Sequence, residues 1–165
     1  MQAKCIDVNV HEKYITCQDD TNSSNTTVPY DKLIIACGAV SNTFGIQGVR
    51  EHALFLKDIS DARRIRHRVL TCFEQAVSSP SRHYLLNFAI VGAGPTGIEF
   101  AAELHDFIRE DIRKLYPALV EKCRIRVFDI APRILSSFDA SLSEYTKAKF
   151  TRDGIQVQTG KLHKF

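Results

Sequence analysis

The spacing of apolar residues changes several times between residues 85 and 159. A continuous apolar run at 85–91 is typical of a buried strand, and a second run follows at 125–128. Between them, positions three or four apart indicate a helical pattern, which contains a break at Pro117: Ile98, Ala101, His105, Ile108, Ile112, Leu115 and Leu119. The order strand, helix, strand predicts an α/β fold with a parallel, Rossmann-like doubly wound sheet.

The same pattern continues to the end of the chain. Asp139 is placed to cap a second helix that stops at Asp153–Gly154, and residues 155–158 alternate as a third strand. The apolar side of this helix is expected to carry Leu142, Tyr145 and Phe150. Because a doubly wound domain normally continues with further strands, we expect only its first half here, with the third strand near an open edge.

Residues 1–84 have a different pattern. Residues 4–17 alternate around a polar turn and predict a β-hairpin, and the polar stretch from Asp19 to Thr27 predicts a loop or a hairpin tip. Apolar runs predict a strand at 33–38 and a short strand at 54–56. A helix is expected from Asp58, its N-cap, with Asp61 in the first turn. Its apolar stripe is Ile59, Ala62, Ile65, Val69, Cys72, Phe73 and Ala76.

A glycine motif joins the strand at 85–91 to the long helix. Gly92, Gly94 and Gly97 form a G-x-G-x-x-G pattern, with Pro95 and Thr96 inside it. The first glycine permits a tight turn, the second leaves space for a pyrophosphate, and the third lets the helix pack closely on the strand. Pro95 suits a first helical position, and the free N–H groups there attract phosphates. Dinucleotide binding is thus predicted; the alternative is a tight βα turn that binds nothing.

Asp129 ends the second strand of this unit. An acid at that position accepts hydrogen bonds from the ribose hydroxyls of the dinucleotide and repels a 2′-phosphate, which favours NADH over NADPH. Arg133, four residues on, can soften that preference. Asp129 lies further beyond Gly97 than the usual spacing of about 20 residues, and the prolonged helix accounts for the excess.

Composition narrows the function classes. The chain has 165 residues, 44% of them hydrophobic and 25% charged, as in a globular domain. A net charge of +3 is too small to indicate nucleic acid binding. No apolar run has the length of a membrane span, and the sequence contains no targeting segment. The arginines at 63, 64, 66 and 68 indicate a solvated helix face, or alternatively a contact with an anionic lipid or partner.

Cysteine and histidine spacing argues against several other sites. The five cysteines contain no C-x-x-C pair, so their spacing supports neither a disulfide framework, nor a zinc site, nor a redox-active dithiol: Cys5, Cys17, Cys37, Cys72 and Cys123. A reducing compartment fits this pattern best. The six histidines have no metal-ligand spacing, and no metal is expected.

Several stretches resemble one family. They are Tyr30–Ala39, Phe44–Val49, Glu51–Lys57 and Val91–Leu104, followed by the long helix to Pro117. Together they resemble the FAD-dependent pyridine nucleotide reductases, and more closely the mitochondrial type II, non-proton-pumping NADH:quinone oxidoreductases. The sequence GPTGIEFAAEL at 94–104 is the most specific part.

The resemblance implies a domain organisation. Residues 1–57 would be the β-rich end of the first FAD-domain segment, 58–84 a connecting helix and linker, and 85–165 the first half of an NADH domain. The chain is then expected to be an internal fragment, inactive on its own with NADH and quinone. The parent would associate peripherally with the mitochondrial inner membrane through regions absent here, and homodimerisation is open.

The resemblance also implies a chemistry. The parent would pass hydride from NADH to FAD and electrons on to quinone. Ala36, Cys37 and Gly38 match the family's Ala-Thr-Gly on the FAD side, with Cys37 in place of threonine. Glu99 matches an acid near the nicotinamide and flavin; alternatively it is a first-turn carboxylate favoured by the helix dipole. Asp129 stands where NADH-using members usually carry glutamate. The alternatives are a related NAD(P)H reductase with another acceptor and a non-catalytic nucleotide-binding fragment.

Overall fold

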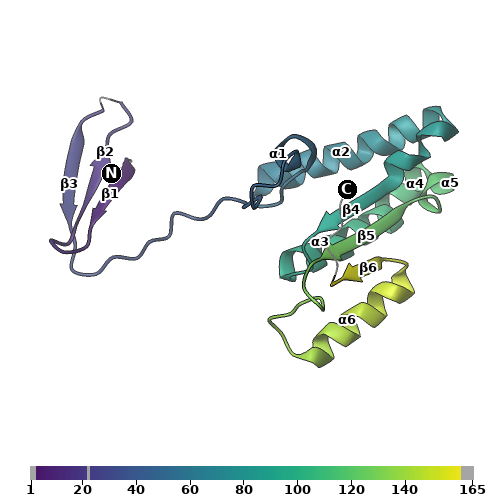
Figure 1. The fold of residues 1–165 in the computed structure, drawn as a ribbon. Coiled ribbons are helices and arrows are strands. Elements are labelled where there is room, and N and C mark those ends of the chain that lie inside the picture. Colours follow the sequence, from purple (N-terminus) through teal and green to yellow (C-terminus); the bar gives the residue numbers. More distant parts are fainter. Residues whose placement is uncertain (1–2, 22, 161–165) are drawn as a thin grey trace. The chain divides into compact units, whose positions relative to one another are not determined.

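The computed structural model describes residues 3–21 and 23–160. The chain divides into two compact units, one within residues 1–44 and the other within 45–165 (Figure 1). Within the described ranges, no helix is long and apolar enough to cross a membrane, and no group of three or more His, Cys, Asp or Glu side chains is arranged to hold a metal ion.

The first unit is a three-stranded antiparallel sheet. Strands β1 (Lys4–Asn9) and β2 (Tyr14–Gln18) form the predicted hairpin, and β3 (Asn25–Pro29) pairs with the other side of β2. The prediction that the loop extends to Thr27 was therefore wrong, because residues 25–27 belong to β3. Thr26 and Thr27 are β-branched and lie opposite Cys17 and Thr16, so they complete a regular ladder in spite of their polarity.

No strand forms at 33–38 or at 54–56, which corrects both predictions. Ile34 and Ile35 are 89% and 72% exposed in an extended segment without strand pairing. A strand is defined by hydrogen bonds to a neighbouring strand, and within the described residues this segment has no such neighbour. Apolar composition alone does not supply one.

The second unit is built on a parallel sheet in the order β4-β5-β6. Its strands are β4 (Asn87–Val91), β5 (Arg124–Asp129) and β6 (Gln156–Thr159), all three predicted to within two residues. The crossover from β4 to β5 runs through α3 (Pro95–Asp106), the π-helical segment η2 (Phe107–Ile112) and α4 (Arg113–Leu115), and then α5 (Pro117–Val120). This confirms the Rossmann-like α/β fold, and β6 lies at an edge of the sheet (Figure 1).

Helix α2 (Ile59–Ser78) begins as predicted. The Asp58 side chain accepts a hydrogen bond from the Asp61 N–H at 3.0 Å, and the Asp61 side chain accepts from the Asp58 N–H at 3.3 Å. This reciprocal capping box satisfies two N–H groups at the helix start. The short helix α1 (Val49–His52) precedes α2, and the 3₁₀ helix η1 (Pro80–Leu86) follows it and occupies the start of the predicted strand.

Helix α6 (Ala140–Asp153) departs from its predicted packing. Asp139 stands at the N-cap, but its side chain makes no capping hydrogen bond. Leu142 and Tyr145 are 42% and 64% exposed, so only Phe150 of the expected apolar stripe is buried. A buried Ser143 lies on the inner side instead, and its hydroxyl donates to the Ile134 carbonyl at 2.7 Å.

One hydrophobic core joins the helices to the sheet in the second unit. Phe73 of α2 is fully buried, and its ring lies 5.9 Å from that of Tyr116 and 6.5 Å from that of Phe88 on β4. Val127 at the centre of β5 is also fully buried. Strand β4, which leads into the glycine motif, and strand β5, which ends at Asp129, therefore rest on a packed core, as a precise binding site requires.

Candidate dinucleotide site

The chain turns sharply where β4 ends. Gly92 has a φ of +109°, a backbone conformation that residues with a side chain rarely adopt. Its N–H donates to the carbonyl of Phe128 on β5 at 2.8 Å. The first glycine of the motif thus stays hydrogen-bonded to the sheet while it sends the chain toward α3.

Gly97 lies where the helix meets this turn. A Cβ atom at Gly97 would stand 1.9 Å from the carbonyl oxygen of Gly92, far inside van der Waals contact. Any side chain would push the first turn of α3 away from the end of β4. The predicted role of the third glycine in close packing is supported by this geometry.

Gly94 is the N-cap of α3, and the space around it is open. A Cβ there would meet nothing within 4 Å, and the φ of −74° is allowed for any residue. No side chain caps this helix end, and Pro95 occupies the first turn. The exposed N-terminus therefore presents N–H groups without helical partners, together with the positive end of the helix dipole. Such a helix start can bind a phosphate.

Asp129 binds the glycine loop directly. One carboxylate oxygen accepts the Ala93 N–H at 2.6 Å, and the other accepts the Ala131 N–H at 2.8 Å. The side chain thereby joins the glycine loop to the loop that follows β5. A carboxylate has about four acceptor positions, so room remains for ribose hydroxyls. The sequence indicated the position of this acid but gave no sign of its bonds to the backbone.

A second contact between the same loops was also missed. The Leu135 N–H donates to the Ala93 carbonyl at 2.8 Å, and Ala93 is only 2% exposed. Ala93 is a variable position of the motif pattern, so its type carried no signal. Its backbone is nevertheless bonded through both its N–H and its carbonyl, which fixes the loop at this position.

The remaining predicted residues lie apart from these contacts or in the other unit. Glu99 is exposed on α3, but it is the fifth residue of the helix, so placing it in the first turn was wrong. Ala36, Cys37 and Gly38 are exposed in the extended segment of the first unit, where Gly38 has a φ of +78°. Their predicted roles stay predictions.

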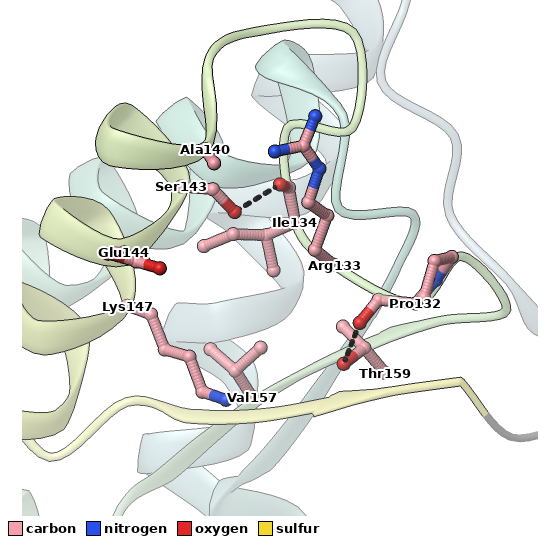
Figure 2. Close-up of a pocket in the computed structure, with 9 residues that line it drawn as sticks. All are labelled: Pro132, Arg133, Ile134, Ala140, Ser143, Glu144, Lys147, Val157 and Thr159. Carbon is pink, nitrogen blue, oxygen red and sulfur yellow. Dashed lines mark hydrogen bonds between the residues drawn. The ribbon is translucent and has the colours of Figure 1, made fainter.

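A cavity of ≈ 170 Å³ lies beside the loop after β5, between α6 and β6 (Figure 2). Arg133 lines it, yet its guanidinium donates to the carbonyls of Ser136 at 3.1 Å and Phe138 at 2.9 Å. The Thr159 hydroxyl donates to the Pro132 carbonyl at 3.2 Å. Arg133 therefore holds its own loop through Nη2.

The sequence matches one protein family and several curated oxidoreductases. The profile of the pyridine nucleotide-disulphide oxidoreductase family matches residues 1–164. The chain is 48% identical to the mitochondrial external alternative NAD(P)H-ubiquinone oxidoreductase B1 of Arabidopsis thaliana over 155 residues, 92% of this chain and 27% of that protein. It is 39% identical to the mitochondrial external NADH-ubiquinone oxidoreductase 2 of Saccharomyces cerevisiae, with 96% of this chain and 30% of that protein covered.

A solved structure agrees with the sequence relatives. NDH2 from Plasmodium falciparum in complex with NADH superposes with a TM-score of 0.81 at 37% identity, covering 96% of this chain and 33% of that one. The chain therefore spans about a third or less of the relatives it matches. The resemblance to type II NADH:quinone oxidoreductases is confirmed, and the chain belongs to the pyridine nucleotide-disulphide oxidoreductase family.

Proposed function

We propose that this chain supplies the nucleotide-binding part of an FAD-dependent NADH:quinone oxidoreductase. The observation that carries the proposal is the uncapped start of α3 beside an unobstructed Gly94, with Asp129 fixed at the end of β5. The names of the relatives, NADH-ubiquinone and NAD(P)H-ubiquinone oxidoreductases, supply the reaction class. Hydride transfer and electron transfer are chemistry of the nicotinamide and flavin cofactors.

The roles of the chain's own residues are binding and orientation. N–H groups at the start of α3 bind the pyrophosphate, and Gly94 leaves the space that it needs. Asp129 keeps its two backbone bonds and accepts ribose hydroxyls with its remaining acceptor positions. Glu99, exposed on the following turn, is assigned to the neighbourhood of the nicotinamide by the family resemblance.

Asp129 also favours NADH over NADPH. A 2′-phosphate about 4 Å from its carboxylate would cost up to about 4 kcal/mol at an effective dielectric constant near 20. Arg133 is the nearest basic residue in the following loop, but two backbone carbonyls already accept from its guanidinium. These two hydrogen bonds hold the guanidinium on its own loop.

The FAD side belongs to residues 1–57 in this proposal. Residues 1–57 end the first segment of an FAD domain, with Ala36, Cys37 and Gly38 facing the flavin cofactor; residues 58–84 connect, and residues 85–165 begin the NADH domain. The mitochondrial names of the relatives support a mitochondrial location. Peripheral attachment to the inner membrane and a homodimer belong to the parent protein.

The test uses the full-length protein that contains this chain. It is loaded with FAD, and NADH oxidation is followed with and without a short-chain ubiquinone while quinol formation is measured in parallel. We expect quinone-dependent oxidation with one quinol formed per NADH. Oxidation that proceeds only with a disulfide or protein acceptor, or NADH binding without turnover, would contradict the proposal and favour the related reductase or the non-catalytic module.

A further inference from the structure

Two cysteines lie directly opposite each other in the sheet of the first unit. Cys5 of β1 is the Cα partner of Cys17 on β2, in an antiparallel pair (Figure 1 shows the two strands side by side). The register shifts between Cys5 and Asp7, where Ile6 is the extra residue of a β-bulge. Without this bulge, the pairing of Asp7 with Thr16 would continue to Ile6 and Cys17. The bulge therefore places Cys5, and not Ile6, opposite Cys17.

Directly opposite residues in an antiparallel pair project from the same face of the sheet. Val8 and Ile15 form another such pair, so Cys17, two residues beyond Ile15, lies on the face that they make apolar. Cys17 is only 7% exposed, whereas Cys5 is open to solvent. The pair therefore consists of one accessible thiol and one sheltered thiol on a common face.

The spacing of such a pair suits a disulfide. Opposite residues in an antiparallel ladder have Cα atoms about 4.5–5.5 Å apart, within the range of about 4.4–6.8 Å seen in disulfides. In the reduced form, the Cys5 thiol donates to the Asp7 carbonyl at 3.5 Å. Forming the bond requires a rotation about the Cys5 side chain, with loss of that weak hydrogen bond and little movement of the backbone.

We propose that Cys5 and Cys17 are a thiol–disulfide exchange site that reacts with small-molecule disulfides such as oxidised glutathione. The Cys5 thiolate attacks one glutathione sulfur, which breaks the glutathione S–S bond and releases the first reduced glutathione. The Cys17 thiolate then attacks Cys5 Sγ and displaces the second. The protein dithiol is oxidised, one disulfide co-reactant is reduced to two thiols, and the two protons from the cysteines end on the released glutathione.

The other cysteines are poorer partners. Burial raises the pKa of the Cys123 thiol to about 12 and also raises the pKa of the Cys72 thiol, so burial makes both poorer nucleophiles. Cys37 is exposed, but it lies in the extended segment without a strand partner. Only Cys5 and Cys17 are placed opposite each other among the strand pairs of the described residues. This proposal does not depend on the enzymatic function proposed above.

The first experiment maps the bond. The full-length protein is incubated with oxidised glutathione, its free thiols are alkylated, and the unreduced digest is analysed by mass spectrometry. We expect a peptide pair joined through Cys5 and Cys17 in the wild type and in the control Cys37→Ser. Cys5→Ser and Cys17→Ser should lack it, with circular dichroism confirming that Cys5→Ser, altered only at an exposed site, is folded. Alkylation of both cysteines, or a Cys5–Cys37 link, would overturn the proposal.

A second measurement separates the intramolecular bond from glutathione attached to Cys5 alone. The oxidised fraction is measured in glutathione buffers of constant reduced-to-oxidised ratio but different total concentration. Because two reduced glutathiones are released, diluting the buffer tenfold should raise the ratio of disulfide to dithiol by about tenfold. A ratio that stays constant on dilution indicates a mixed disulfide and would overturn the proposal.

Discussion

Asp129 uses both of its carboxylate oxygens on backbone N–H groups, one in each of two loops. The hydrogen bonds from the Ala93 N–H at 2.6 Å and the Ala131 N–H at 2.8 Å fix the carboxylate at the edge of the candidate dinucleotide site. They also hold the glycine loop against the end of β5. Hydrogen bonds to a charged acceptor are stronger than neutral ones. Asp129 therefore fixes the shape of the loop, and in the proposed function the same side chain also sets the choice of cofactor.

The prediction at this scale concerns cofactor choice in the variant Asp129→Asn. The wild type should have a higher kcat/KM with NADH than with NADPH, and the variant should lose most of that preference because the charge that repels a 2′-phosphate is gone. The amide also offers a single acceptor oxygen, so it keeps only one of the two backbone bonds, and kcat/KM with NADH should fall as well.

Asp139→Asn is the matched control. It removes the same charge from an exposed side chain that makes no capping hydrogen bond, at the end of the connection between β5 and α6. Its preference should equal that of the wild type. A wild type that uses NADPH as well as NADH, or an Asp129→Asn protein with undiminished preference, would contradict the assignment.

At the scale of elements, α2 begins on a pair of charged caps. Asp61 is buried and accepts from the Lys57 N–H at 2.8 Å, from the Asp58 N–H and from the Arg64 guanidinium. The hydrogen bond from Arg64 is the main reason that the pKa of Asp61 lies below its usual value, and the hydrogen bond from Ser60 chiefly lowers the pKa of Asp58. Both shifts mean that the folded state favours the ionised carboxylates.

The second prediction is that acid weakens this helix start. Because the folded pKa of each Asp is depressed, its contribution to stability is present above the unfolded pKa of about 4 and is lost as pH falls through the lower folded value. Asp61→Asn should lower the unfolding temperature at pH 7 and show a smaller further loss between pH 5 and pH 3. Glu74→Gln removes an exposed charge on the same helix, and its unfolding temperature should match that of the wild type both at pH 7 and in acid. Equal acid dependence in Asp61→Asn and the wild type would contradict this account.

Some of the elements could be predicted from the sequence and others could not. The strands β4, β5 and β6, the long helix and the α2 cap could be predicted, because each has a local signal: an apolar run, a period or a capping pair. The segment at 33–38 has the apolar run but no strand beside it among the described residues, and a strand needs a partner. Likewise the pairing of Cys5 with Cys17 depends on a bulge, which no spacing rule for cysteines contains.

The dinucleotide site divides in the same way. The positions of Gly92, Gly94, Gly97 and Asp129 follow from the motif and from the order of strand, helix and strand. The bonds to Ala93 from both neighbouring loops do not, since they join backbone atoms that are far apart in sequence and independent of residue type. Sequence thus locates the candidate site, and the folded structure shows which hydrogen bonds hold its loops.

At the scale of the whole molecule, we propose that the chain carries parts of two sites. The glycine loop and Asp129 lie in the unit within residues 45–165, and the segment with Ala36, Cys37 and Gly38 lies in the unit within residues 1–44. In the proposed reaction, a nicotinamide must be held against a flavin, and a small misplacement loses most of the rate. Binding can be tested apart from turnover, because the proposal requires the start of α3 to bind the pyrophosphate of NADH.

Gly94→Ala tests that claim because the folded chain has room for the change. The added methyl group meets nothing within 4 Å and the backbone conformation is allowed, so the unfolding temperature should not change. The methyl group does occupy the space assigned to the pyrophosphate. Gly97→Ala cannot serve, since its Cβ would collide with the Gly92 carbonyl and disturb the fold itself.

The decisive measurement is the dissociation constant of NADH for the full-length wild-type and Gly94→Ala proteins, taken with their unfolding temperatures. We predict a constant at least about tenfold larger for the variant, a loss of about 1.4 kcal/mol or more in binding free energy, at an unchanged unfolding temperature. An equal dissociation constant in two equally stable proteins would show that the pyrophosphate does not lie at Gly94 and would contradict the account.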